Sequence, residues 1–457
     1  MKMLDNDQWV LQQFGECDLG DKRRTERLKK VAGNMLASPE KSLPEQNVEW
    51  ADVKAAYRFF DNPNITFEKV AQQHWQQTRQ TKPGRYLLIC DTTDIDHYSH
   101  KATTGLGILG DGQGRGMQFH NCLMYDSEKK LIVGAAGALI HYRKPTRKGE
   151  TRAQRLSRVR DSSVWGDLVD QIGCAPNGSQ WIHVWDRGGD NFEAMCHLRL
   201  AGNDWVIRAS KLDRQVISED GQRMPLSKAI KDARTLGSYE LRLRSREGVA
   251  ARTAKLELRT VSVTYPAPSH HSKWVRNCGI SEIRMNVVVV QEVNAPKGVK
   301  PIQWVLLTSL PVNTFEDAWQ VVEDYENRWL VEEYHKVIKS ACSVERHALQ
   351  TAERLEPLIG LISVIGTRLF QLKLIGRSQP EARAATHVPA SWLKCLKLAR
   401  PKLQMTGLTV YGFFRELAKL GGFLARTGDG EPGWQTVWRG FSKMQSLLDG
   451  MRLVGAI

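Results

Sequence analysis

The sequence lacks cysteine pairs, long apolar runs and the common nucleophile and nucleotide motifs. Its eight cysteines are scattered along 457 residues, which excludes a disulfide framework or a zinc ribbon and predicts reduced, mostly buried thiols. The longest apolar stretches, 131–140 and 358–366, are too short to span a bilayer, and acids stand where a signal peptide needs an apolar run, so we expect no membrane anchor. The sequence has no GxxxxGKS, GxxxxGKT, GxSxG or HExxH motif, which argues against P-loop, serine-hydrolase and zinc-protease chemistry.

Acidic residues are in deficit. The chain has 65 Lys and Arg against 50 Asp and Glu, a formal net charge of +15, which favours a polyanionic partner such as nucleic acid. Its 14 Trp residues offer flat faces for unstacked bases, although most Trp residues lie in protein cores. With 41% hydrophobic and 25% charged residues the composition is that of a globular protein, and the length leaves room for about three domains.

Two features resemble cofactor or metal sites but lack the context that such sites need. Residues 105–110 match GxGxxG, yet glycines continue to 116 and lead into a strand pattern, so we expect a hairpin loop and no dinucleotide site. Four histidines have no cysteine partner at zinc spacing and are interpreted as loop or surface residues: His97, His100, His270 and His271.

Helical and strand-rich segments alternate along the chain. We expect a helical unit first, with a boundary between 67 and 83, and a long helix after a capping box at Thr314 and Asp317. The elements predicted in order are a helix at 66–80, strands at 85–93, 117–125, 130–140 and 180–186, a helix near 190–200, a strand at 205–210, a β-rich insertion at 238–310, the long helix to about 340, and further helices to the end.

Two basic segments point to phosphate groups. Arg23, Arg27 and Lys30 share one face of a predicted helix, and such a stripe can lie on phosphates, although a solvated helix face is its commoner meaning. The segment 141–160 carries eight Lys and Arg against one acid, Glu150, a density that favours a phosphate partner over a solvated loop.

Two aspartates follow apolar strand patterns. Asp91 comes after YLLIC and Asp186 after WIHVW. A carboxylate beside a central strand is costly to bury unless it is paired or bound to metal, so two of them suggest a divalent cation. The alternative is that each aspartate caps a turn, and the pattern by itself favours neither interpretation.

The long predicted helix supplies a third acid. At about 100° per residue, Tyr325, Arg328, Glu332 and Lys339 share a face about 60° wide, whereas Glu333 points away. Such a face suits a phosphate site, and the alternative is a surface salt bridge between Arg328 and Glu332. Three acids suit two magnesium ions acting on a phosphodiester, a reaction that needs no protein nucleophile.

Several motifs together resemble those of a known family. They are LGDKRRTERL (19–28), AAYRFFDNPNI (55–65), DTT (91–93), WDR (185–187), WVLLTS (304–309), YENRWLVEEYHKVIK (325–339) and LAKLGGF (417–423). The chain resembles the DDE transposases of bacterial insertion sequences (the IS-four family), in the branch that contains the Tn5 transposase. The resemblance extends from about residue 19 to 450.

The resemblance implies a multidomain α/β fold with three parts. Residues 1–72 would form a helical domain that binds transposon ends, and residues 73–372 an RNase H-like catalytic domain with a β-rich insertion at about 212–311. Residues 373–457 would form a helical dimerisation domain. The implied partners are transposon-end and target double-stranded DNA and a second copy in a synaptic homodimer, with neither a membrane nor a small-molecule cofactor, in the bacterial cytoplasm or on the nucleoid.

The resemblance also assigns roles to individual residues. Asp91, Asp186 and Glu332 would be the catalytic acids and hold two Mg²⁺ ions, for which Mn²⁺ would substitute. By interpretation of the sequence alone, Trp304 is a core or sheet-face aromatic; the resemblance makes it the platform for a flipped base. The other implied DNA contacts are Tyr325, Arg328, Lys339, Arg208, Arg187, Arg23, Arg24 and Arg27.

The implied activity is cut-and-paste transposition, with nicking, hairpin formation, hairpin opening and strand transfer at one site. The sequence departs from its relatives at Cys90, which replaces an acid, and at Met117 and Gln118, which replace two aromatics beside the implied base-capture site. Two alternatives remain open: a structure-selective nuclease with an RNase H-like core, and a non-catalytic DNA-binding relic or inhibitor of transposition.

Overall fold

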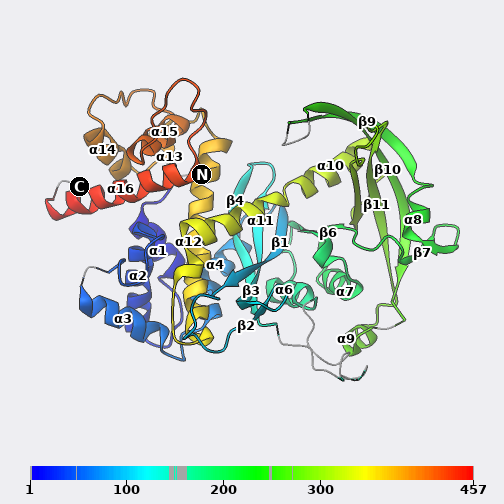
Figure 1. Cartoon of the computed structure of the whole chain (residues 1–457), viewed down its shortest axis with the longest axis horizontal. Coiled ribbons are helices and arrows are strands. Elements are labelled where there is room, and N and C mark those ends of the chain that lie inside the picture. The colour runs from blue at the N-terminus through cyan, green and yellow to red at the C-terminus, as the bar shows by residue number, and fades with distance from the viewer. Residues whose placement is uncertain are drawn as a thin grey trace.

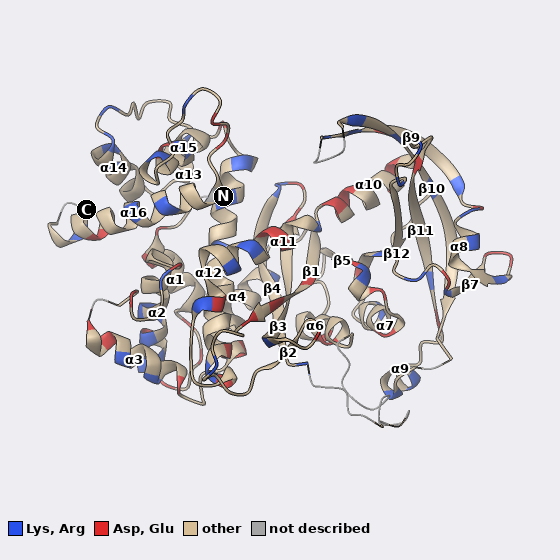
Figure 2. Ribbon diagram, viewed as in Figure 1, with Lys and Arg blue, Asp and Glu red and all other residues tan. Residues whose placement is uncertain are grey.

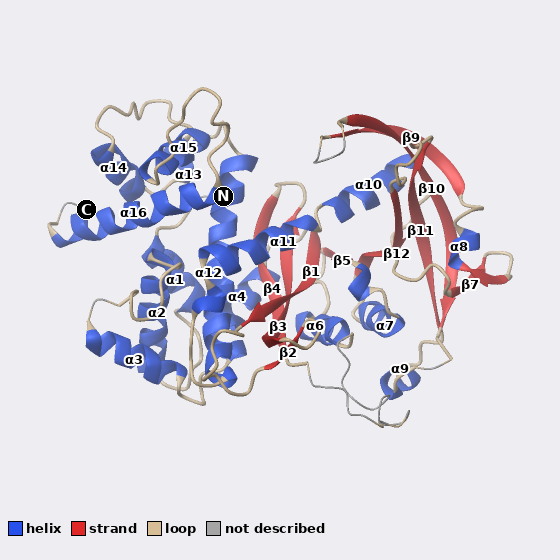
Figure 3. Cartoon of the chain, viewed as in Figure 1, coloured by secondary structure: helices blue, strands red, loops and turns tan. Residues whose placement is uncertain are grey.

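A central mixed sheet separates a helical end of the molecule from a β-rich lobe (Figure 1). The computed structural model describes residues 3–47, 49–143, 149, 151, 162–245, 250–269 and 271–455. Within these residues the fold is mixed α/β with helices at both ends of the chain, and the two terminal helical segments lie on the same side of the sheet (Figures 1 and 3).

The N-terminal segment folds into four helices. Asp21 begins the second helix by accepting a hydrogen bond from the Arg23 backbone N–H, and Thr66 begins the fourth by accepting one from Lys69 N–H. The fourth helix confirms the helix predicted at 66–80. The helices are α1 (Asn6–Phe14), α2 (Lys22–Ala37), α3 (Trp50–Phe60) and α4 (Phe67–Arg79).

The central strands follow the order β4-β3-β1-β5-β6. β1 is antiparallel to β3, β3 is antiparallel to β4, and β1, β5 and β6 run parallel. The hairpin loop predicted at 105–116 is a hairpin in which the short strand β2 pairs with the start of β3. The strands are β1 (Arg85–Asp96), β2 (Gly107–Leu109), β3 (Gly114–Asp126), β4 (Leu131–His141), β5 (Gln180–Trp185) and β6 (Asp204–Arg208).

Each face of the central sheet buries its own hydrophobic core. Alternation along β1 directs Leu87 and Ile89 to the face covered by α4 and by the long helix α12 (Ala352–Ser378). Leu88 and Cys90 face the other side, where they meet α6 (Val164–Ile172) and α7 (Phe192–Leu200). The central strands of the expected catalytic domain are therefore covered by helices on both faces.

The β-rich lobe continues the same sheet, because β12 (Gln303–Thr308) pairs with β6. The long strands confirm those predicted between 238 and 310, whereas the short elements before residue 230 were missed. The remaining elements of the lobe are β7 (Gln215–Ser218), β8 (Arg223–Pro225), α8 (Leu226–Ala229), β9 (Arg234–Leu243), β10 (Arg252–Pro266), α9 (Lys273–Asn277) and β11 (Glu282–Val293).

The predicted long helix is wrong as a single continuous element. Its capping box is present, but the helix divides into α10 (Phe315–Glu326) and α11 (Trp329–Lys336), followed by a π-helical turn at Val337–Ala341. The side chain of Asn327 donates a hydrogen bond to the Glu323 carbonyl, and this competition with the backbone accompanies the break.

Helices complete the chain, as predicted. One of them, α12, is long and apolar enough to cross a membrane by length and composition, but 89% of its most apolar window is buried inside the protein. The expected domain boundaries after residues 72 and 372 fall inside α4 and α12 and stay predictions. The last helices are α13 (Ala384–His387), α14 (Ala390–Ala399), α15 (Val410–Leu420) and α16 (Trp434–Leu453).

The cysteine and histidine predictions have different outcomes. All eight cysteines are free, and six of them are buried, which confirms the thiol prediction. His97 lies in the loop after β1, which agrees with its interpretation as a loop or surface residue, although it is 0% exposed. His100 and His271 are partly exposed, and His270 lies outside the described residues.

Candidate active site

Asp91 and Asp186 lie at the same level on neighbouring strands. β1 and β5 run parallel with Ile89 paired to Val184, and each aspartate lies two residues further along its own strand direction. Parallel strands are about 4.8 Å apart, so this register brings the two carboxyl groups together. Both aspartates line one cavity of about 340 Å³.

The two aspartates differ in local setting. β1 continues to Asp96, so Asp91 lies within its strand and not at the end as predicted. Asp186 follows the last residue of β5 and accepts a hydrogen bond from Gly188 N–H at 2.7 Å, which begins a 3₁₀ turn. Asp186 therefore caps a turn and also lines the cavity. A turn-capping role and a metal-binding role are thus compatible for this residue.

Arg328 joins Asp91 to Glu332. Its Nη1 lies 3.0 Å from Asp91 Oδ2, and its Nη2 lies 2.5 Å from Glu332 Oε1. The side chain of Arg328 is only 14% exposed. The Arg328–Glu332 salt bridge considered as an alternative is therefore present, but its guanidinium also holds a carboxylate from the central sheet.

The charges of the three acids act on one another. Burial and then the negative charge of Asp186 raise the pKa of Asp91 to about 6. The negative charge of Glu332 contributes to this rise in pKa, while the Thr92 backbone N–H and the positive charge of Arg328 oppose it. The three carboxyl groups are therefore close enough to affect one another's charge. Their mutual repulsion destabilises the site when all of them are ionised.

The donor set fits a hard cation better than zinc. Three carboxylates without a nearby thiolate are ligands of the kind that Mg²⁺ and Mn²⁺ prefer. Among the residues that the structure describes, no three His, Cys, Asp or Glu side chains are grouped so that they could hold one ion together. Arg328 accounts for this, because its guanidinium pairs with both Asp91 and Glu332.

A second cavity, of about 460 Å³, lies beside Trp304. The Arg208 guanidinium lies 5.9 Å from the centre of the Trp304 ring, and the Tyr325 ring meets Trp304 edge-on at 5.1 Å. Two of the predicted DNA contacts, Arg187 and Arg208, also line this cavity. Its other polar lining residues are Gln291, Lys300 and Gln303.

Tyr325 interacts with arginines from both parts of the candidate site. Burial raises the pKa of Tyr325, and the neighbouring positive charges of Arg208 and Arg328 partly offset that rise. The Tyr325 phenol therefore lies between Arg208, which lines the Trp304 cavity, and Arg328, which pairs with the acids. The predicted face is present from Tyr325 to Glu332.

Lys339 comes after the end of α11. It falls in the π-helical turn and pairs with Glu345 at 3.3 Å. A π turn holds more residues than an α turn, so the angle of Lys339 departs from the value for a regular α-helix, and its place on the shared face stays a prediction. The structure thus groups Tyr325, Arg328 and Glu332, but directs Lys339 to a different carboxylate.

The N-terminal arginines lie on α2, away from the acids, and Figure 2 shows the basic residues of α2 and α3. Arg23 is 92% exposed and pairs with Asp21, while Arg24 donates to the Leu19 carbonyl. Arg27 and Lys30 both pair with Asp52 of α3, at 3.0 and 2.7 Å. One carboxylate therefore neutralises part of the predicted basic stripe.

The basic segment 141–160 lies mostly outside the described residues. Of its described members, His141 and Arg143 line the cavity that contains Asp91 and Asp186. The segment thus begins at the wall of the candidate active site.

The structure adds an aromatic residue that the sequence analysis did not single out. Trp329, the first residue of α11, is 52% exposed, and Lys336 Nζ lies 5.1 Å from its ring centre. The sequence signal that could have identified Trp329 is a Trp directly after Arg328 in a polar segment. Gln291 had no such signal, because the pairing of β11 with β12 brings it beside Trp304.

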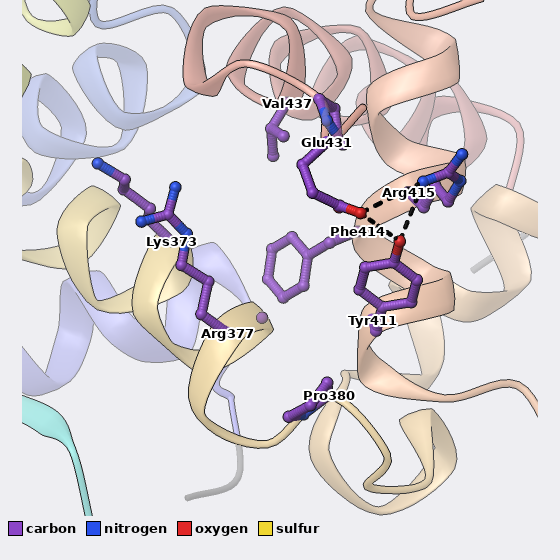
Figure 4. Close-up of a pocket in the computed structure, with 10 residues that line it drawn as sticks. Lys373, Arg377, Pro380, Tyr411, Phe414, Arg415, Glu431 and Val437 are labelled. Carbon is purple, nitrogen blue, oxygen red and sulfur yellow. Dashed lines mark hydrogen bonds and ion pairs between the residues drawn. The ribbon is translucent and has the colours of Figure 1, made fainter. Parts of the chain in front are cut away.

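A further, more apolar pocket occurs among the C-terminal helices. This cavity of about 450 Å³ has Phe414 and Val437 in its wall, and Arg415 bonds to Tyr411 and Glu431 there (Figure 4). It contains none of the predicted acids. Its volume is close to that of the cavity beside Trp304, so volume alone does not identify the candidate active site.

Two family models match the chain. Residues 6–65 match a transposase DNA-binding domain, and residues 364–456 match the Tn5 transposase dimerisation domain. The first match covers the helices that carry the basic stripe, and the second begins within α12. The three acids lie between the two matches. With a transposase DNA-binding domain near one end and a Tn5 dimerisation domain near the other, the chain is a Tn5-like transposase.

Proposed function

We propose that this transposase is a DDE enzyme that moves DNA by cut-and-paste transposition. Asp91, Asp186 and Glu332 would be its catalytic acids, acting in nicking, hairpin formation, hairpin opening and strand transfer. The observation that carries the proposal is the shared electrostatic site of the three acids, which two parallel strands and α11 bring together.

The topology supports an RNase H-like catalytic core. The strand order β4-β3-β1-β5-β6, with the first three strands antiparallel and the last two parallel to β1, is the arrangement that such a core has. The β-rich lobe is inserted after β6 and returns through β12. The acid-bearing α11 then follows, so the insertion separates Glu332 from the aspartates in sequence but not in space.

The acids would hold two Mg²⁺ ions, or Mn²⁺ in their place. When bound, the ions would activate the attacking water or hydroxyl and stabilise the leaving oxygen of the phosphodiester. No single ion has to be held by all three acids, which agrees with the lack of a three-residue ligand cluster among the described residues. Arg328 would neutralise Asp91 and Glu332 until metal and DNA arrive, and then turn to a DNA phosphate.

The remaining residues would bind and orient DNA. Trp304 would stack on a base that leaves the helix during hairpin formation, since stacking offsets part of the cost of unstacking. Tyr325, Arg328 and Lys339 would hold the phosphate beside that base, and Arg187 and Arg208 the neighbouring backbone. The end-binding contacts would be Arg23, Arg24 and Arg27.

The products formed from end DNA test the proposal. The substrate is a linear duplex built from the DNA that flanks this gene in its source genome, incubated with Mg²⁺ or with EDTA. A hairpin that forms only with Mg²⁺ is expected. Nicks without hairpins would indicate a structure-selective nuclease, and a bound but uncut duplex would indicate a DNA-binding relic or inhibitor.

Removing the Arg328 charge should increase the stabilisation that a divalent cation provides. In Arg328→Gln the three carboxyl groups lose their counter-charge, so the metal-free variant should unfold at least about 2 °C below the native protein. Added Ca²⁺ should then raise its melting temperature more than that of the native protein.

Thermal unfolding with EDTA or Ca²⁺ measures both effects. Arg187→Gln is the matched control, because it removes an exposed cation next to Asp186 without breaking a pair with Asp91 or Glu332. Equal Ca²⁺ shifts in all three proteins would contradict the role of Arg328 as the counter-charge.

Removing the Asp52 carboxylate should strengthen end binding. Asp52→Asn frees Arg27 and Lys30 from their shared partner, so both cations become available to phosphate. Exposed ion pairs contribute about 0.2–1 kcal/mol, so we expect an affinity increase of up to about five-fold.

Fluorescence anisotropy over a range of salt concentrations measures this change. The affinity of Asp52→Asn should also fall more steeply with salt, because more counterions are released. Unchanged affinity and salt dependence would place Arg27 and Lys30 outside the DNA contact.

A further inference from the structure

Arg368 is a buried cation that makes one hydrogen bond within the described part of the chain. It lies on α12, is 3% exposed, and donates from Nη2 to the Leu4 carbonyl at 2.6 Å. Its guanidinium also lies 5.9 Å from the Trp9 ring, and its Nε has no partner among the described residues. Burial lowers the pKa of Arg368 to about 10, so the side chain stays protonated at neutral pH.

The described residues offer Arg368 no ion pair. The carboxylate of Asp5 acts on it from a distance, but Asp5 accepts a hydrogen bond from Gln8 N–H and caps α1. The neighbouring His74 is neutral, because its Nε2 accepts from Ala135 N–H and burial lowers its pKa to about 4. A protonated guanidinium is therefore buried without a compensating charge in contact.

Arg368 lines a cavity of about 310 Å³ between α1, α4, α12 and β4. The wall combines apolar and polar side chains, and among the described residues that line it Arg368 carries the only charge and no carboxylate is present. The cavity has room for several water molecules or for a small anion. Its other polar lining residues include Gln12, Gln77, Thr78 and Gln371.

Burial of an unpaired charge is costly, and water compensates for it less well than an opposite charge does. The planar fork of a guanidinium matches carboxylate and phosphate oxygens. We propose that this cavity binds a small oxyanion that presents a phosphate or carboxylate group to Arg368.

The position of the cavity gives the anion a structural consequence. α1 belongs to the matched DNA-binding domain, and Arg368 belongs to the matched dimerisation domain. The bound anion lies between these two domains and stabilises the contact between them. This inference is independent of the proposed catalytic chemistry.

Titration of the metal-free full-length protein tests the site. Thermal unfolding is followed in increasing sodium phosphate and, separately, sodium citrate, each against sodium chloride of equal ionic strength. A saturable rise in melting temperature is expected with at least one anion, and broadening of the ³¹P resonance of phosphate reports binding directly. Binding of phosphate alone assigns a phosphoryl group, and binding of citrate alone assigns a carboxylate.

Three variants tie the binding to the cavity. Arg368→Gln should weaken binding about tenfold or more, because it removes the charge that the anion contacts. Gln12→Glu should also abolish binding by placing a negative charge in the wall, and it leaves intact the hydrogen bonds that Gln12 makes through its backbone carbonyl. Arg377→Gln, an exposed position further along α12, should bind as the native protein does.

The Gln12→Glu variant decides the outcome if Arg368→Gln does not fold. A response to phosphate and citrate that matches sodium chloride would overturn the proposal. So would saturable binding that Gln12→Glu and a folded Arg368→Gln leave unchanged.

Discussion

Asp186→Asn is expected to abolish DNA cleavage, with a loss of about 10³-fold or more, while end binding stays unchanged. The asparagine keeps a side-chain oxygen that can accept the Gly188 N–H bond, so the turn after β5 should be preserved. What is lost is the negative charge that faces Asp91. A fall in cleavage would then result from loss of the negative charge and not from a change in the fold.

The same variant should not lower stability in the absence of metal. Asp186 raises the pKa of Asp91, which means that the two carboxylates repel each other. Removing one charge relieves this repulsion, so the melting temperature in EDTA should stay equal or rise. Cleavage time courses, gel-shift titrations and thermal unfolding measure the three properties, and loss of end binding in a folded Asp186→Asn would argue against a purely catalytic role.

Trp304→Ala is expected to slow hairpin formation by about 5- to 150-fold, the equivalent of the 1–3 kcal/mol that stacking of one base contributes. The first nick should change much less, because it needs no flipped base. Trp304 is suited to this role because it lines a cavity together with Arg187 and Arg208 and is held edge-on by Tyr325.

Trp304→Phe is the matched control, since it keeps an aromatic face and should retain most of the hairpin rate. Gel time courses that resolve nicked and hairpin products measure both steps. Equal slowing of the nick and of the hairpin in Trp304→Ala would show that Trp304 supports the fold of the site and not base capture.

Strong local patterns were predictable from the sequence. The apolar run before Asp91 forms β1, the Thr314 capping box begins α10, and the β-rich segment after 238 forms long paired strands. These signals depend on residues that are close in sequence. The terminal helical domains were predictable for the same reason, and the family matches confirm a transposase with DNA-binding and dimerisation domains.

Features that depend on packing between distant segments were not predictable. The second partner of Arg328 is Asp91, 237 residues away, and helical periodicity shows only its partner Glu332. Lys339 lies in a π turn and pairs with Glu345. This was not predictable, because a change in the number of residues per turn has no simple sequence signal. The cavity beside Trp304 depends on the pairing of β12 with both β6 and β11.

The central claim is that Asp91, Asp186 and Glu332 together hold divalent metal. Iron-mediated cleavage tests it directly: Fe²⁺ replaces Mg²⁺, and ascorbate with hydrogen peroxide then cuts the backbone next to the bound ion. Cuts are expected in β1 near Asp91, after β5 near Asp186 and in α11 near Glu332, all suppressed by excess Mg²⁺ and lost in Asp186→Asn. Cuts confined to other segments, or the same three cuts in Asp186→Asn, would contradict it.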